Sequence, residues 1–186
     1  MIRTTSAIAL LSLLSMTVPT DAPPPRPAYI ILVRHADKPG DPTDPHLSPA
    51  GVTRASQLAS FITSDPEMTK YGAPIAIFAT QTTKHDNGQR TQETVAPLAA
   101  ALKLQVQTPY LGKDYAALAK QILSNPAYAG KTILICWNHE VIPQLVAALG
   151  VAPEPPKWKG SIFDRVYVIS YRKRHASLAE SRYGAK

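Results

Sequence analysis

The chain has 186 residues, of which 45% are hydrophobic and 18% charged, and its formal net charge is +7. This length suits one globular domain and is too short for two of ordinary size. The basic balance is compatible with phosphorylated substrates, but basic and aromatic residues do not interleave into a stacking platform, so we expect no nucleic-acid partner. Cys136 is the only cysteine, which excludes an internal disulfide, and its apolar neighbours predict a core position.

The N-terminal segment has the pattern of an export signal. Arg3 precedes a largely apolar, charge-free stretch from Ala7 to Val18, which ends at Pro19. The stretch is shorter than the roughly 20 residues of a spanning helix, which favours a signal peptide rather than a membrane anchor. The predicted signal peptide comprises residues 1–22. A proline-rich linker over 23–27 and a single domain over 28–186 follow. We expect an exported protein, periplasmic or secreted, with no stable membrane span after cleavage. The sequence leaves open a retained anchor and the oligomeric state.

Apolar runs and helical patterns alternate along the rest of the chain. Strands are predicted at 29–33, 75–79, 132–137 and 166–171, with a short edge strand at 104–107. Helices are predicted at 49–64, 91–102, 115–123 and 141–149. The alternation indicates a three-layer α/β/α sandwich with a largely parallel central sheet. In such sheets ligands bind beyond the carboxyl ends of the strands.

Two of these strands run directly into a histidine. His35 follows the first strand and has Arg34 beside it, and His139 follows the strand at 132–137. If the strands are parallel, both histidines lie at one rim of the sheet. An arginine fork matches the geometry of phosphoryl oxygens, and a neutral imidazole can act as a nucleophile near pH 7. The pattern therefore favours phosphoryl chemistry.

Four segments of the chain carry a family resemblance. They are Leu32 to Lys38, Leu47 to Ala55, Gln89 to Ala99 and Trp137 to Glu140. In this order they resemble the motifs of the histidine phosphatase superfamily, also called phosphoglycerate mutase-like. Each motif is short, but the resemblance as a whole covers about Tyr29 to Tyr171. A departure from the family pattern is the longer stretch from Thr80 to Gly88.

The resemblance implies a phosphomonoesterase, a hydrolase that forms a phosphohistidine on His35 and releases it to water. Arg34, Arg90 and His139 then bind the oxygens of a small phosphorylated substrate, whose identity the sequence does not give. No metal or other cofactor is implied, and neither His46 nor the pair His85-Asp86 follows a metal-binding pattern. Two alternatives stay open: a non-catalytic phosphate-ligand-binding envelope protein on the same fold, and a protein phosphohistidine phosphatase.

The proton donor is the least determined part of the predicted site. Glu140 directly follows the second histidine, where one branch of the family has its acid, usually an aspartate. Asp37 and Asp114 are the other candidates, and Glu140 alternatively only offsets the dipole of the following helix. For Arg90 the alternative is a surface pair with Glu93, three residues on.

Three loops are expected to line the pocket, and one aromatic residue is expected elsewhere. The loops run over 38–46, 82–88 and 111–115. Trp158, which follows two prolines and a lysine, is expected to pack in the core.

Overall fold

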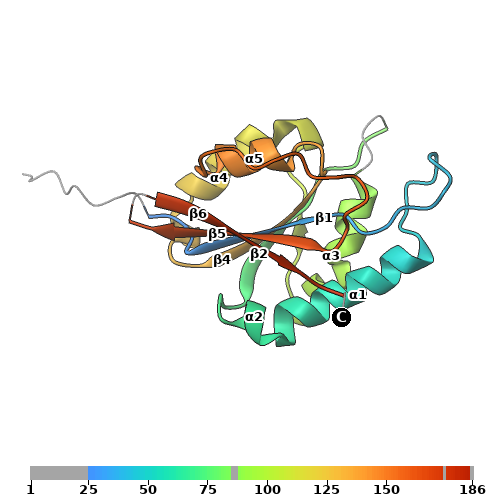
Figure 1. Ribbon diagram of the computed structural model, residues 1–186, viewed down its shortest axis with the longest axis horizontal. Helices are drawn as coiled ribbons and strands as arrows, with labels where there is room; N and C mark the ends of the chain where they lie inside the picture. Colours follow the sequence, from blue (N-terminus) through green and yellow to red (C-terminus); the bar gives the residue numbers. More distant parts are fainter. Residues whose placement is uncertain (1–24, 85–87, 174, 185–186) are drawn as a thin grey trace, which may run out of the picture.

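A computed structural model describes residues 25–84, 88–173 and 175–184, so the predicted signal peptide lies outside the described residues. The described chain forms a three-layer α/β/α sandwich around one six-stranded sheet of order β3-β2-β4-β1-β5-β6 (Figure 1). The predicted layer architecture is thereby confirmed. None of the described helices is both long and apolar enough to cross a membrane.

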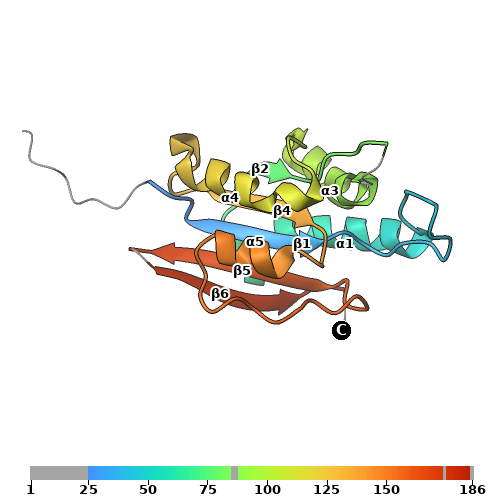
Figure 2. The same cartoon turned by 90° about the horizontal axis from the view of Figure 1, so that it is seen from above.

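The sheet is mixed, which corrects the expectation of a largely parallel one. Its strands are β1 (Tyr29–Arg34), β2 (Pro74–Phe78), β3 (Val106–Gln107), β4 (Thr132–Trp137), β5 (Arg165–Arg172) and β6 (His175–Arg182). The first four are parallel to one another, whereas β5 is antiparallel to β1 and β6 is antiparallel to β5. An apolar run predicts a strand but not its direction. Figure 2 shows the β5–β6 pair at the edge of the sheet opposite β2.

Strand β6 was not predicted, because it has no apolar run. Its residues are exposed or half-buried throughout, as befits an edge strand with one solvated face. Arg172 ends β5 and His175 begins β6, and Lys173, next to Arg172 in the chain, has a φ of 54°.

The four predicted helices agree closely with the structure, which adds one short helix and two 3₁₀ turns. The helices are α1 (Pro49–Ser64), the short α2 (Pro66–Thr69), α3 (Gln89–Leu102), α4 (Tyr115–Ser124) and α5 (Ile142–Ala148), with 3₁₀ turns η1 (Gly112–Asp114) and η2 (Pro126–Tyr128). Helix α1 begins as predicted because Ser48 caps it, accepting a 3.1 Å hydrogen bond from the backbone N–H of Gly51.

Each face of the sheet has its own core. Helices α4 and α5 cover one face and α1, α2 and α3 the other, as Figure 1 shows for α4 and α5 above the sheet and α1 and α2 below it. Strand β1 contributes side chains to both cores: Ile30 and Leu32 lie on the first face, and Ile31 and Val33 on the second. Cys136 is fully buried on the second face, as expected, and burial raises the pKa of its thiol.

Candidate active site

The two strands that lead to His35 and His139 are neighbours in the sheet. Strand β1 pairs in parallel with β4, and Arg34 lies opposite Trp137. His35 and His139 therefore leave the sheet at the same rim, which confirms the expectation. Strand β5 is antiparallel, with Val166 opposite Val33, so the residues that precede β5 arrive at this rim as well.

A cavity of about 220 Å³ lies at this rim. It is lined by Arg34, His35, Lys38, Arg90, Asn138, His139 and Glu140. All five residues proposed from the sequence as catalytic or substrate-binding thus line one cavity, and their roles stay predictions. Lys38 belongs to a loop expected to line the pocket. Asn138 was not assigned a role, although it stands directly between the end of β4 and His139.

His35 is arranged as a neutral imidazole with one free nitrogen. Its side chain is 8% exposed, and its Nδ1 lies 2.8 Å from the carbonyl oxygen of Ala36. Because a carbonyl can only accept, Nδ1 carries the hydrogen and Nε2 keeps its lone pair. Burial, then the positive charges of Arg34 and Arg90, lowers the pKa of His35 to about 4, although the bond to Ala36 opposes this. The imidazole is therefore neutral near pH 7.

Arg34 is a buried and rigidly fixed cation. Its Nη1 donates hydrogen bonds to the carbonyl oxygens of Gly160, at 2.5 Å, and Ile162, at 3.2 Å. The guanidinium carbon lies 3.9 Å from the ring centroid of Phe163, a cation–π contact. Burial lowers the pKa of Arg34 to about 10, so it stays charged at neutral pH. Its Nε is buried and has no hydrogen-bond partner among the described residues.

Sequence reasoning missed the segment that fixes Arg34. Gly160, Ile162 and Phe163 reach the rim only because β5 runs antiparallel to β1. Tyr183, just after β6, holds this segment from the other side, since its hydroxyl donates to the carbonyl oxygen of Phe163 at 3.2 Å. No motif marks these residues, and the backbone carbonyls of Gly160 and Ile162 can be recognised only from coordinates.

Arg90 lies in the first turn of α3 and is fixed by a neighbouring loop. Its Nε and Nη2 donate to the carbonyl oxygens of His46, at 3.2 Å, and Asp44, at 2.6 Å. The alternative pairing with Glu93 is not observed: that carboxylate instead bonds to His46 Nδ1 at 2.5 Å and to the backbone N–H of Leu47 at 2.9 Å. Glu93 therefore ties down the loop that positions Arg90.

The start of α3 is fastened to the end of β2. Thr91 Oγ1 accepts from the backbone N–H of Thr80 at 3.1 Å and donates to the carbonyl oxygen of Gly88 at 2.7 Å. Gly88 is required by this close approach, since a Cβ there would lie 2.5 Å from the carbonyl oxygen of Gln81. The loop predicted over 82–88 includes residues 85–87, which lie outside the described residues, as do His85 and Asp86.

Of the three candidate proton donors, Glu140 is the one that lines the cavity, and its side chain is exposed. Asp37 pairs with Arg54, and Asp114 lies at the start of α4, so neither lines the cavity. Helix α5 begins at Ile142, two residues after Glu140. Within the described part of the chain, no three His, Cys, Asp or Glu side chains are grouped as metal ligands would be.

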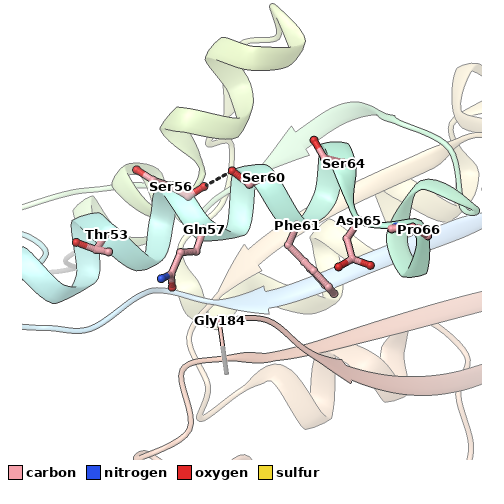
Figure 3. Close-up of a pocket in the computed structure, with 9 residues that line it drawn as sticks. All are labelled: Thr53, Ser56, Gln57, Ser60, Phe61, Ser64, Asp65, Pro66 and Gly184. Atoms are coloured by element: carbon pink, nitrogen blue, oxygen red, sulfur yellow. Dashed lines mark hydrogen bonds between the residues drawn. The ribbon is translucent and has the colours of Figure 1, made fainter. Parts of the chain in front are cut away.

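A larger cavity, of about 600 Å³, shares no lining residue with the cavity that holds the two histidines, and Figure 3 shows it beside α1. It is lined by Thr53, Ser56, Gln57, Ser60, Phe61, Ser64, Asp65, Pro66 and Gly184, mostly from one face of α1. Its lining contains no histidine, lysine or arginine, and its one carboxylate, Asp65, caps α2 by accepting from the backbone N–H of Glu67. The lining of this cavity therefore has neither the cations nor the histidines of the smaller one.

Comparison with known proteins identifies the fold. No protein-family model matches the sequence, and a search of the curated proteins finds no significant match. Among solved structures, the chain is similar to phosphoserine phosphatase from Entamoeba histolytica, with a TM-score of 0.55, 15% identity, and 83% of this chain and 95% of that one covered. A mycobacterial glucosyl-3-phosphoglycerate phosphatase gives a TM-score of 0.52, with 15% identity and coverage of 85% and 97%.

A protein from Agrobacterium tumefaciens, provisionally named phosphohistidine phosphatase SixA, gives a TM-score of 0.51, with 13% identity and coverage of 86% and 99%. At these identities the likeness establishes the fold. It is the phosphoglycerate mutase-like fold that the four sequence motifs implied.

Proposed function

We propose that the chain is a phosphomonoesterase that works through a phosphohistidine on His35. One observation carries the proposal: a neutral imidazole with a free Nε2 shares a cavity with two guanidinium groups, of Arg34 and Arg90. A lone pair on nitrogen supplies the nucleophile, and fixed cations offset the charge that spreads over the phosphoryl oxygens in the transition state.

In the first step His35 Nε2 forms a bond to phosphorus while the bond from phosphorus to the ester oxygen breaks. The Nε of Arg34 is a buried donor that has no partner in the described part of the chain, and a phosphoryl oxygen would satisfy it. Arg90 and His139 supply further donors from the other sides of the cavity. Glu140 gives its proton to the departing alkoxide.

In the second step water attacks phosphorus and the bond between phosphorus and Nε2 breaks. Glu140, now a carboxylate, accepts a proton from that water, and inorganic phosphate leaves. The hydrogen bond from His35 Nδ1 to Ala36 stays in place throughout and keeps the ring in the tautomer that the reaction needs. The enzyme thus returns to its starting protonation state.

The names of the similar solved structures state activities that support this proposal. Those named phosphoserine phosphatase and glucosyl-3-phosphoglycerate phosphatase act on small phosphorylated compounds, and we propose the same broad class of substrate here.

We also propose that the protein is exported, on the strength of the charged start and apolar run at residues 1–22. N-terminal sequencing of the protein from separated cell fractions tests the export and the cleavage.

The experiment that tests the function is hydrolysis of 4-nitrophenyl phosphate by the purified full chain in EDTA. We expect turnover by the parent protein and none by His35→Ala. His175→Ala is the matched control, because His175 is exposed on β6 and does not line the cavity that holds His35 and His139. A folded parent that binds inorganic phosphate but turns over no ester would instead support the binding protein.

A further inference from the structure

A second cavity, of about 270 Å³, lies directly beside the first. It is lined by His139, Glu140, Lys157 and Trp158. His139 and Glu140 line both cavities, so these two side chains form the boundary between them. If Glu140 protonates the ester oxygen, that oxygen lies at this boundary. The rest of the leaving group then extends to the far side of Glu140, into the second cavity.

The segment that carries Lys157 and Trp158 is fixed by the active site itself. The Gly160 carbonyl oxygen accepts the hydrogen bond from Arg34, and a Cβ on Gly160 would lie only 3.3 Å from His139 Nε2. Pro155 and Pro156 precede Lys157 and restrict the backbone on its other side. The second cavity is therefore held in a set position relative to the two histidines.

Trp158 supplies a rigid apolar wall. It is 3% exposed, which confirms the expected core position, yet it also lines the cavity. Its Nε1 donates to the carbonyl oxygen of Ile162 at 2.9 Å, and its ring packs edge-on against Tyr167 with 5.0 Å between centroids. Because the indole N–H is already bonded, this wall offers a ligand an apolar contact and no hydrogen bond.

Lys157 supplies the charge. It is exposed, and within the described chain no carboxylate lies within ion-pair distance of its ammonium group. Glu140, an ionisable group that also lines this cavity, is the proton donor of the proposed reaction. A cation beside an apolar wall is suited to an anionic group at the end of an apolar body.

We propose that the second cavity is the leaving-group subsite, and that it selects phosphomonoesters whose leaving group has an apolar body ending in an anion. The proposal rests on the phosphatase function proposed above. The apolar body lies along Trp158, and Lys157 pairs with the terminal anion. A carboxylate or a second phosphate would serve, since both present oxygen acceptors with negative charge.

The test compares the hydrolysis of 4-carboxyphenyl phosphate and phenyl phosphate by the full-length protein. For each protein the ratio of the two kcat/KM values is measured, and ratios are then compared between proteins, so that the different reactivities of the esters cancel. We expect Lys157→Met to lower the ratio by about two- to fivefold, the range of a partly exposed ion pair. Lys159→Met is the matched control, because Lys159 is exposed in the same segment and lines neither cavity. An unchanged ratio in Lys157→Met would overturn the subsite.

A binding measurement separates this proposal from the function on which it rests. Calorimetric titration of His35→Ala, with and without Lys157→Met, gives the affinities of both esters in the absence of turnover. If the parent has no turnover but binds the carboxylated ester more tightly, and Lys157→Met abolishes this preference, the subsite proposal is supported and the phosphatase function is refuted. If the parent turns over both esters and Lys157→Met changes neither the kcat/KM ratio nor the relative affinities, the phosphatase function is supported and the subsite proposal is refuted.

Discussion

The depressed pKa of His35 makes the stability of the protein depend on pH. The pKa is about 4 in the folded protein, against 6.5 for an unperturbed histidine, because burial and nearby cations disfavour the protonated ring. Between pH 4 and pH 6.5 the unfolded chain therefore binds more protons at this residue than the folded one. Stability consequently rises with pH across that window and is lost as the pH falls through it.

Replacing His35 with Asn removes this contribution. With the two pKa values above, His35 should lower the free energy of unfolding by about 2 kcal/mol between pH 7 and pH 5, or about 4–8 °C in Tm. We expect thermal unfolding followed by tryptophan fluorescence to show this loss in the parent and a smaller one in His35→Asn. The exposed His175→Asn serves as control and should follow the parent. Equal losses in the parent and His35→Asn would refute the assigned electrostatics.

Three further outcomes test the site. Glu140→Gln should lower kcat for phenyl phosphate by about 10²–10³-fold. It should lower kcat for 4-nitrophenyl phosphate, whose leaving group needs no proton, by less than about tenfold, and the control Glu154→Gln should change neither value. Equal losses on both esters would exclude Glu140 as the acid. Gly88→Ala should lower Tm by about 4–8 °C, because its Cβ would overlap the Gln81 carbonyl. Gly40→Ala should not, since its Cβ meets nothing within 4 Å, and an unchanged Tm in Gly88→Ala would contradict the close approach. Activity should be the same with and without EDTA; turnover lost in EDTA and restored by a divalent cation would show that a metal takes part.

The sequence predicted those parts of the fold that have a strong periodic signal. Helix α1 begins and ends where its pattern indicates, and β1 and β4 appear as uninterrupted apolar runs because both of their faces are covered. Strand β6 has no such run, since it lies at the sheet edge and is solvated on one side. The direction of β5 was equally hidden, because hydrophobic pattern is the same for parallel and antiparallel strands.

The same limit explains what was missed at the site. His35 and His139 stand directly after apolar strands, so a simple topological rule placed them at one rim. The carbonyl oxygens that fix Arg34 belong to residues 160 and 162, more than 120 positions away, and they reach it only through the antiparallel strand. Trp158 was correctly predicted to lie in the core. It also lines the cavity beside Glu140, and this depends on the path of the segment that precedes β5, which the sequence does not show.

The central claim is that His35 carries the phosphoryl group during turnover. The direct measurement is mass spectrometry of the protein quenched in alkali within milliseconds of mixing with excess 4-nitrophenyl phosphate, since a phosphoramidate survives alkali better than acid. We expect one added phosphoryl group on the peptide that contains His35, and none in His35→Ala. Steady turnover by the parent with no phosphoryl group on that peptide at any time would contradict the claim, because water would then be attacking the substrate directly.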